Sequence, residues 1–253
     1  MHLPRSVTDF LSLAATISAR YDEGSRETAG DTWTGRGDLR LNFGPRDAFD
    51  WIYAVLHSRG YRVRYTEFLK ADFPRIPSPR NLDTFASLVP LGRALVGLHL
   101  LKPDEAPILT TPDIRLAGRG DARVERGYPQ YANGRVMINE SRWFEDVPRE
   151  TWEFHVGGYQ VCEKWLEGRA AKGGNNPSLG RVLTEEDILH YRRLVTAITE
   201  TRRLMTEIDQ VIEVHGGWPG AFDVQSPPPP SIEEIVEANE SLELEFKATF
   251  QWT

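Results

Sequence analysis

Residues 184–217 read TEEDILHYRRLVTAITETRRLMTEIDQVIEVHGG, and this stretch decides the fold because it predicts one long amphipathic helix. Thr184 followed by three acidic residues is typical of a helix start, where a hydroxyl caps backbone N–H groups and carboxylates meet the positive end of the helix dipole. Gly216 and Gly217 are typical of a helix end. At about 1.5 Å per residue, such a helix is about 45 Å long. Its apolar face is formed by Ile188, Tyr191, Leu194, Val195, Ile198, Met205, Ile208 and Ile212.

A helix of that length needs a partner, and residues 82–101 are the natural candidate. Their leucines recur at steps of three and four residues, and Pro90 predicts a kink. His99 lies in this apolar stripe, so we expect a buried histidine with a hydrogen-bond partner and not a ligand. Four arginines on the outer side of the 184–214 helix either contact phosphates or only keep the helix hydrated: Arg192, Arg193, Arg202 and Arg203.

The residues before position 82 predict short helices separated by extended chain. Helical spacing of apolar residues recurs in 48–56 and in 61–69. The segment 72–79 contains three prolines, which exclude a helix and predict an exposed extended strap. Residues 1–47 are expected to be a mobile lead-in with a possible short helix at 10–19. Asp9 beside that apolar run argues against a secretory signal.

The middle of the chain changes to strand patterns. Asn133-Gly134 favours a tight hairpin turn, so residues 123–125 and 135–139 are predicted to be two strands of an antiparallel sheet. The alternation in 152–156 fits a further strand, and 159–167 a short helix. We therefore expect an α+β fold, in which helical segments flank a small antiparallel or mixed sheet and a long amphipathic helix lies toward the C-terminus.

Composition sets outer limits on the class of protein. The 253 residues carry a net charge of −7 and one cysteine, Cys162. A single cysteine excludes a disulfide scaffold and favours a reducing compartment, so we expect a cytoplasmic protein. No apolar run is long enough to cross a membrane, so no membrane partner is expected.

Charge is unevenly distributed along the chain. Residues 59–80 hold six basic and two acidic residues, a net charge of +4, whereas 232–247 hold six acidic residues and one basic residue, a net charge of −5. The proline run within 226–231 predicts a stiff linker. We therefore expect a domain at 48–225, a linker at 226–231 and an acidic tail at 232–253 that is possibly the start of a truncated further domain.

Motifs for common catalytic sites are missing from the sequence. There is no Gly-rich phosphate loop, no spaced Cys/His set for a metal and no Gly-x-Ser-x-Gly elbow. Glu243, Glu245 and Lys247 match the Glu-x-Lys half of a metal-dependent nuclease site. An alternating exposed strand also produces that pattern by chance, so no catalytic residue and no metal ligand is assigned.

Four stretches resemble a known family. They are residues 50–58 (DWIYAVLHS), 67–77 (EFLKADFPRIP), 152–166 (WEFHVGGYQVCEKWL) and 202–209 (RRLMTEID). They resemble the C-terminal specificity region of type ISP restriction–modification enzymes and of related adenine-specific DNA methyltransferases, over about residues 35–209. The methyltransferase motif of Asn or Asp, two prolines and an aromatic residue is not in this sequence. The resemblance therefore implies target recognition without catalysis.

The resemblance implies double-stranded DNA and a methyltransferase or restriction domain or subunit as partners. It implies no cofactor in this chain, and S-adenosylmethionine only in a separate methyltransferase part. Side chains that grip phosphate and side chains that read bases are expected. The phosphate candidates are Arg59, Arg62, Arg64, Arg75 and Arg80, and the base-reading candidates are Gln160, Lys164, Lys172, Asn175 and Asn176.

Two other functions stay open at this point. The chain is either a protein-interaction remnant of a truncated restriction enzyme that does not bind DNA, or a fragment that contributes to a metal-dependent nuclease site. Binding of DNA at low salt separates the first of these from target recognition, and metal-dependent cleavage of DNA separates the second.

Overall fold

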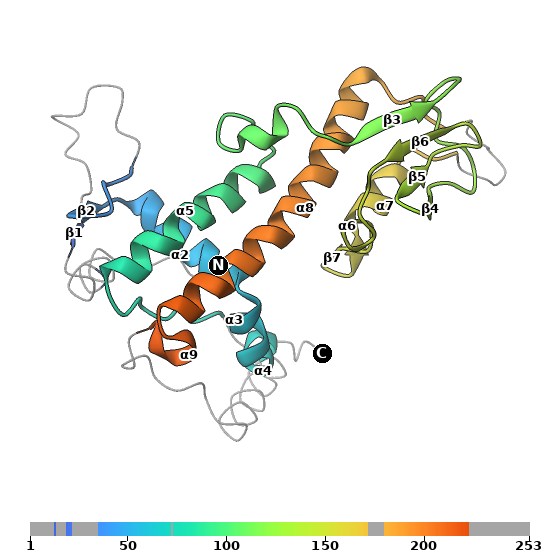
Figure 1. Cartoon of the computed structure of the whole chain (residues 1–253). Coiled ribbons are helices and arrows are strands. Elements are labelled where there is room, and N and C mark those ends of the chain that lie inside the picture. Colours follow the sequence, from blue (N-terminus) through green and yellow to red (C-terminus); the bar gives the residue numbers. More distant parts are fainter. Residues whose placement is uncertain (1–12, 14–18, 22–34, 72, 172–179, 223–253) are drawn as a thin grey trace, which may run out of the picture. The chain divides into compact units, whose positions relative to one another are not determined.

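The computed structural model describes residues 13, 19–21, 35–71, 73–171 and 180–222 (Figure 1). The chain divides into two compact units, which are described separately. Unit 1 comprises residues 1–93 and 204–253, and unit 2 comprises residues 94–203. The predicted α+β class and the long helix are confirmed, because α8 (Glu185–Val214) extends over 30 residues and a small antiparallel sheet lies in unit 2. Among the described residues, no helix has the length and apolar character needed to cross a membrane.

Unit 1 is a group of helices around an aromatic core. Its elements are β1 (Arg20–Tyr21), β2 (Asn42–Phe43), α2 (Pro45–His57), α3 (Arg59–Arg64), α4 (Thr66–Ala71), the first part of α5 (Leu82–His99), the last part of α8 and α9 (Gly217–Gly220). The ring of Phe85 contacts those of Phe43 and Trp51, at centroid distances of 5.3 and 5.7 Å. Trp218 stacks on Phe222 at 4.0 Å. The Trp51 ring also lies 6.1 Å from that of Phe222, so aromatic contacts join α2 to residues that follow α8.

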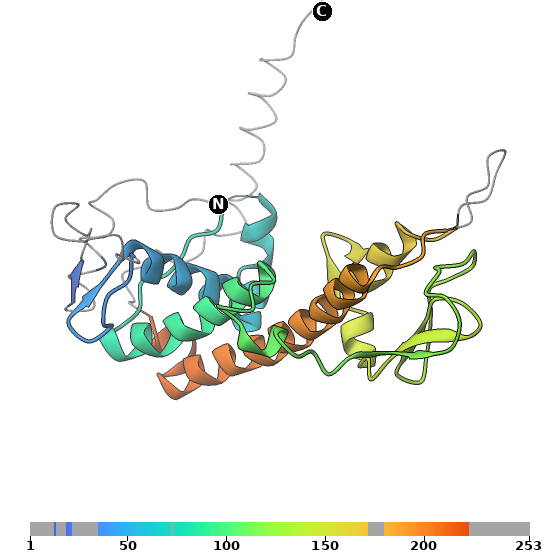
Figure 2. The ribbon, with the colours of Figure 1, turned by 90° about the horizontal axis from the view of Figure 1, so that it is seen from above.

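Helices α2 and α5 lie side by side in unit 1, as both views show (Figures 1 and 2). Gly92 makes this close approach possible, because a Cβ atom at position 92 would overlap the backbone carbonyl of Asp50. Residues 35–47, which the sequence analysis assigned to the lead-in, contribute to this unit: Phe43 is fully buried and belongs to a strand that pairs in parallel with β1. Residues 73–78 of the strap predicted at 72–79 form no helix, as expected, but only Phe73 and Arg75 among them are exposed and Pro77 is buried.

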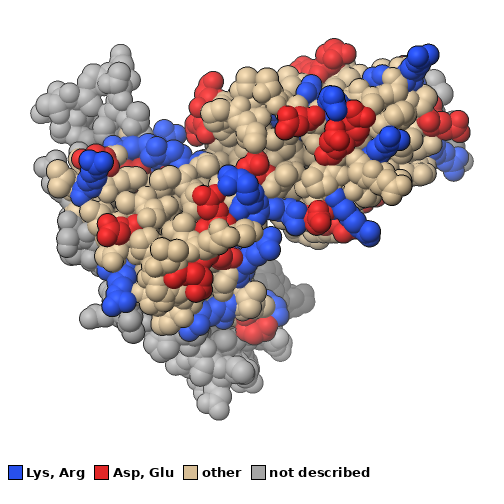
Figure 3. Space-filling view, viewed as in Figure 1, with Lys and Arg blue, Asp and Glu red and all other residues tan. Residues whose placement is uncertain are grey.

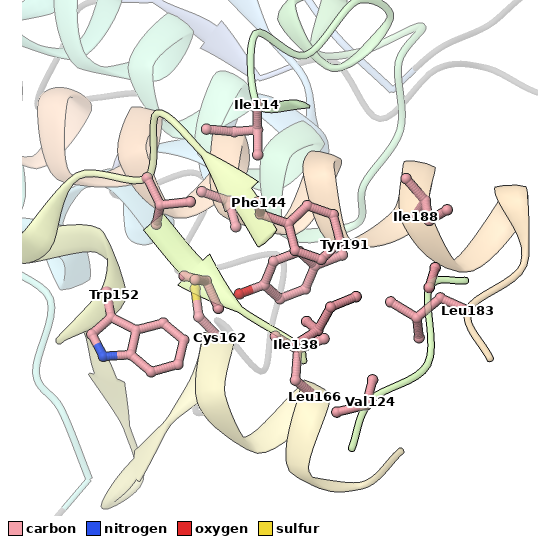
Figure 4. Close-up of a cluster of buried hydrophobic side chains, with 14 of the residues drawn as sticks. Ile114, Val124, Ile138, Phe144, Trp152, Cys162, Leu166, Leu183, Ile188 and Tyr191 are labelled. Atoms are coloured by element: carbon pink, nitrogen blue, oxygen red, sulfur yellow. The ribbon is translucent and has the colours of Figure 1, made fainter. Parts of the chain in front are cut away.

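Unit 2 has an antiparallel sheet of strand order β3-β6-β5-β4. Its elements are the rest of α5, a 3-10 turn at Pro107–Leu109, β3 (Arg115–Gly118), β4 (Gln130–Ala132), β5 (Arg135–Met137), β6 (Arg142–Glu145), α6 (Arg149–Trp152), β7 (His155–Val156), β8 (Tyr159–Gln160), α7 (Val161–Glu167) and the first part of α8. The buried side chains of the sheet, α7 and α8 form one apolar cluster (Figure 4). Cys162 lies in this cluster, and burial raises the pKa of its thiol to about 12. The thiol is therefore protonated at neutral pH and serves as a packing group.

Three sequence predictions for unit 2 need correction. The turn at Asn133-Gly134 is confirmed, with positive φ at both residues, but the strand before it is 130–132 and not 123–125. Two hydrogen bonds, each 2.9 Å long, join residues 123–125 to 135–139: the Glu125 N–H donates to the Ile138 carbonyl, and the Asn139 side-chain amide donates to the Arg123 carbonyl. Trp152 ends the helix α6 and is not in a strand, because strand pairing begins only at His155. His99 is exposed, although its Nε2 lies 2.9 Å from the Thr201 hydroxyl.

Candidate nucleic-acid interface

The basic segment 59–80 begins with the helix α3, and a carboxylate of the protein occupies the N-terminus of that helix. Asp209 accepts a hydrogen bond from the Ser58 hydroxyl at 2.6 Å. It also accepts hydrogen bonds from the backbone N–H groups of Arg59 and Gly60, at 3.2 and 3.3 Å. Free N–H groups at a helix start attract anions. Because Asp209 already satisfies them, the start of α3 offers no phosphate site of its own.

The arginine side chains on α3 differ in what they contact. Arg62 donates from Nε to the Leu56 carbonyl at 2.7 Å, which anchors the base of its guanidinium. Arg59 and Arg64 are exposed, and neither guanidinium has a hydrogen-bond or ion-pair partner among the described residues. These two side chains are therefore available to an external anion at no cost in internal contacts.

Two further phosphate candidates stabilise the strap that follows α4. The Arg75 guanidinium lies 5.2 Å from the centroid of the Phe68 ring, and the Arg75 carbonyl accepts a hydrogen bond from the Tyr61 hydroxyl at 2.9 Å. Arg80 donates from its guanidinium to the Gly220 carbonyl at 3.1 Å and from its backbone N–H to the Ala221 carbonyl at 3.0 Å. Both arginines therefore have structural contacts that phosphate binding would have to preserve or replace.

The base-reading candidates that the structure describes, Gln160 and Lys164, belong to unit 2, whereas the phosphate candidates belong to unit 1. The amide nitrogen of Gln160 is buried and has no hydrogen-bond partner in the part of the chain that the structure describes. Lys164 lies 3.4 Å from the carboxylate of Glu167 and 5.7 Å from the ring centroid of Tyr159. The other three base-reading candidates, Lys172, Asn175 and Asn176, lie outside the described residues.

The arginines of α8 are not a row of outward-facing cations, which corrects the sequence interpretation. Arg192 donates to the carbonyls of Ile114 and Pro112, the latter at 2.6 Å. Arg193 donates to the Leu109 carbonyl at 3.0 Å. These bonds attach the segment after α5 to α8. They also provide hydrogen-bond donors for backbone carbonyls that are not paired in the sheet.

Arg202 and Arg203 form ion pairs with carboxylates. Arg202 lies 4.0 Å from Glu150, and Arg203 lies 2.7 Å from Glu200. Basic and acidic side chains are likewise intermixed on the face shown in Figure 3. Charge alone therefore does not mark an extended basic surface there.

The sequence analysis missed a buried charged cluster in unit 1. Asp47 and Asp50 of α2 are 0% and 1% exposed. Asp47 lies 3.3 Å from Arg36 and 3.2 Å from Arg93, and Arg36 also pairs with Asp50. Burial raises the pKa of Asp50, although both arginines oppose that shift. The sequence did hold a signal for this cluster. Asp47 and Asp50 are three residues apart and so lie on one face of the helix, together with the apolar Trp51.

No metal site is found in the described part of the chain, where no group of three or more His, Cys, Asp and Glu side chains could hold an ion. The Glu243, Glu245 and Lys247 pattern, the proline linker and the acidic tail all lie outside the described residues.

Comparison with protein families gives a match to the type ISP C-terminal specificity domain over residues 13–207. Comparison with curated proteins gives no significant match. One similar solved structure is a nuclease-deletion mutant of the type ISP restriction-modification enzyme LlaGI in complex with a DNA substrate mimic. It is 27% identical, with a TM-score of 0.49, over 66% of this chain and 14% of that chain.

Two other solved structures are similar. The ATP-dependent type ISP restriction-modification enzyme LlaBIII bound to DNA is 20% identical, with a TM-score of 0.49, over 66% of this chain and 11% of that chain. The DrdV–DNA complex is 22% identical, with a TM-score of 0.51, over 65% of this chain and 18% of that chain. The likeness to DrdV concerns the fold. The present chain spans less than a fifth of the length of each of these proteins.

Proposed function

The chain belongs to the family of type ISP C-terminal specificity domains, and from this premise we propose that it selects the DNA target of a larger restriction–modification enzyme. The observation that carries the proposal is the extent of the family match, which runs from residue 13 to residue 207 and so includes α2 through α7 and most of α8. DrdV, whose fold is similar, was solved in complex with DNA, and double-stranded DNA is the partner that we propose for this chain.

The arginines of unit 1 supply the part of the affinity that does not depend on sequence. Contacts to phosphate position a protein on the duplex, whereas contacts to base edges select the sequence. Arg59 and Arg64 are the best phosphate ligands, because they are exposed and form no internal ion pair or hydrogen bond among the described residues. Arg62 contributes to phosphate binding through its terminal guanidinium nitrogens, because only its Nε donates to the Leu56 carbonyl.

Catalysis is proposed to belong to another part of the enzyme. The missing Pro-Pro-aromatic methyltransferase motif supports a separate adenine-specific methyltransferase part, which would bind S-adenosylmethionine. The single cysteine supports a cytoplasmic setting. Transfer of labelled methyl groups to DNA by this chain alone would contradict the separation of recognition from catalysis.

Salt-dependent DNA binding tests the proposal. The full chain is titrated against a fluorescein-labelled 40-base-pair duplex at several NaCl concentrations, and the anisotropy gives the slope of log K against log [NaCl]. Each lost phosphate contact flattens that slope by about 0.9. The Arg59→Ala/Arg64→Ala variant should therefore bind more weakly, with a slope flatter by about two.

The matched control removes the same amount of charge from two lysines already in surface ion pairs. Lys70 pairs with Glu67 at 2.7 Å, and Lys102 pairs with Glu105 at 3.3 Å. The Lys70→Ala/Lys102→Ala variant should keep nearly the original slope. Equal slopes for the arginine variant and the original chain would show that Arg59 and Arg64 only hydrate the surface. Failure of the original chain to bind DNA would contradict the proposed function.

A further inference from the structure

The two-stranded ribbon formed by β7 and β8 is tipped by two glycines. His155 pairs with Gln160 and Val156 pairs with Tyr159. Gly157 and Gly158 have φ values of 56° and 84°, as a two-residue hairpin turn of the primed kind requires. A Cβ atom added at either glycine would meet no other atom of the described residues within 4 Å. The tip is therefore surrounded by open space.

One face of this ribbon presents apolar side chains to solvent. Val156 is 59% exposed and Tyr159 is 62% exposed. Residues directly opposite each other in an antiparallel pair share a face, so Val156 and Tyr159 stand together. Neither belongs to the buried cluster of unit 2, which contains their neighbours Trp152 and Cys162. Folding of unit 2 therefore does not explain why this apolar pair is exposed.

The base of the ribbon is attached to the rest of the unit, although His155 on its other face is exposed. His155 contacts the Glu153 carbonyl through Nδ1 at 2.6 Å. The Gln160 amide nitrogen is buried. The backbone N–H of Val161 donates to the Phe154 carbonyl at 3.2 Å, which closes the base of the ribbon. Because its base is anchored at Gln160 and Val161, the ribbon projects from unit 2 in a set direction, and so does its Val156–Tyr159 face.

The ribbon itself has no acidic side chain, and two of the acidic residues beside it are paired with basic ones. Residues 155–160 contain no acidic side chain. Glu153 pairs with Arg149 at 2.7 Å, Glu167 pairs with Lys164 at 3.4 Å, and Glu163 is partly buried on α7. Lys164 also lies 5.7 Å from the Tyr159 ring centroid, so a cation lies close to the exposed aromatic ring.

We propose that this ribbon enters the DNA major groove and places Val156 and Tyr159 against the methyl group of a thymine in the target. The proposal rests on the proposed function and names the base contact within it. The major groove has the width of a two-stranded ribbon, and the thymine methyl is the apolar group that its base edges present. The bare glycine tip allows the ribbon to approach the bases closely.

Selection from random DNA provides the target needed for the test. The full chain selects from a pool of duplexes with 20 random central base pairs, and sequencing gives the preferred site. Each thymine of that site is then replaced in turn by uracil, which lacks only the methyl group. At one position, uracil should weaken binding by the original chain about three- to fivefold, as expected for one buried methyl group.

Two variants separate the apolar contact from a change in folding. Val156→Ala/Tyr159→Ala removes the pair, and Val156→Thr keeps the shape of one side chain while adding a hydroxyl. In both variants the same uracil replacement should have a smaller effect, because the methyl contact is already weakened, and the salt slope should not change. Leu100→Ala, at a residue of unit 2 that is 56% exposed, is the control and should respond to uracil as the original chain does.

Each outcome decides the proposal. Variants that respond to every uracil as strongly as the original chain, or a selected site without thymine, would overturn the ribbon contact while leaving DNA recognition intact. If the ribbon instead binds a protein, the variants and the original chain would also respond equally to uracil. If the original chain binds DNA with normal salt dependence but selects no sequence, the ribbon contact and target selection both fail. If it binds no DNA, the failure begins with the proposed function.

Discussion

Unit 1 and unit 2 use charged side chains in different ways. Unit 1 buries Asp47 and Asp50 and pairs them with Arg36 and Arg93, so ion pairs lie inside its packed helices. Unit 2 has an apolar cluster at its centre, and its buried Asp187 lies at the start of α8, where it is bonded to Thr184 and paired with Arg169 and Arg181. An ionised group inside a protein is tolerated only when a partner compensates its loss of water.

This difference shows why a count of basic residues is a poor guide to a DNA-binding surface. Arg36 and Arg93 neutralise buried carboxylates, and Arg192 and Arg193 satisfy backbone carbonyls. A guanidinium engaged in this way is not available to phosphate without a structural cost. The best candidates for contacts with DNA are therefore side chains such as Arg59, whose guanidinium binds no carboxylate or carbonyl among the described residues.

The largest expected effect is in the buried cluster of unit 1. Asp47→Asn should lower the free energy of unfolding by about 3 kcal/mol, because it removes the charge that compensates two partly buried arginines. Asp47 also accepts hydrogen bonds from the N–H groups of Gly37 and Gly44, at 2.6 and 2.9 Å. Urea unfolding followed by tryptophan fluorescence measures the change.

The control for this prediction is Glu67→Gln, in an ion pair whose two side chains are 66% and 68% exposed. Exposed pairs contribute at most about 1 kcal/mol, so this variant should unfold nearly as the original chain does. An Asp47→Asn protein as stable as the Glu67→Gln protein would show that the buried cluster is not what holds unit 1 together.

A smaller effect is expected at the edge of unit 2. The Asp187 carboxylate accepts hydrogen bonds from the Thr184 N–H at 3.0 Å and from the Thr184 hydroxyl at 2.8 Å, and the Thr184 hydroxyl accepts from the Asp187 N–H at 3.1 Å. Asp187→Asn should cost about 1–2 kcal/mol of unfolding free energy at pH 7, as expected for loss of a helix cap with charged partners.

The pH dependence of that effect follows from the pKa of Asp187. Burial raises this pKa, but the Thr184 bonds together with Arg181 and Arg169 outweigh burial and leave it below its usual value. The stabilisation is therefore complete above the unfolded-state pKa of about 3.9 and is lost as the pH falls below it. The difference between Asp187→Asn and the original chain should shrink as the pH falls below about 4. If the difference in unfolding free energy did not depend on pH, the ionised Asp187 carboxylate would not be its cause. Asp113→Asn, at an exposed aspartate, serves as the control.

Periodic patterns predicted the elements whose stability is local. The cap at Thr184 and the apolar face starting at Ile188 predicted α8 within one residue at its start, and the leucine pattern predicted α5. The prolines of the strap likewise excluded a helix. In each case the relevant contacts involve residues close in sequence, where spacing carries the information.

Contacts between distant residues were beyond such patterns. The turn at Asn133-Gly134 specified a hairpin, but the pairing of β5 with β6 depends on packing against the cluster that contains Phe144 and Tyr191. The partners of Arg192 lie about eighty residues earlier, at Pro112 and Ile114, so no local spacing could reveal them. The same holds for the candidate phosphate ligands. Tertiary packing decides which arginines contact other parts of the protein and which are left for DNA, and sequence spacing does not show this.

The smallest expected effect separates the two kinds of arginine within segment 59–80. Arg75→Ala/Arg80→Ala removes the contact with the Phe68 ring and the bond to the Gly220 carbonyl. It should lower the free energy of unfolding by about 1 kcal/mol, the usual contribution of a partly exposed cation–π contact and one hydrogen bond. Arg59→Ala/Arg64→Ala removes the same charge without a described internal contact and should change the free energy of unfolding by less than about 0.5 kcal/mol. Urea titrations of the two variants, run side by side, compare them directly. Equal destabilisation would mean that the arginines of this segment do not divide into structural and available groups, and the choice of Arg59 and Arg64 as phosphate ligands would lose its basis.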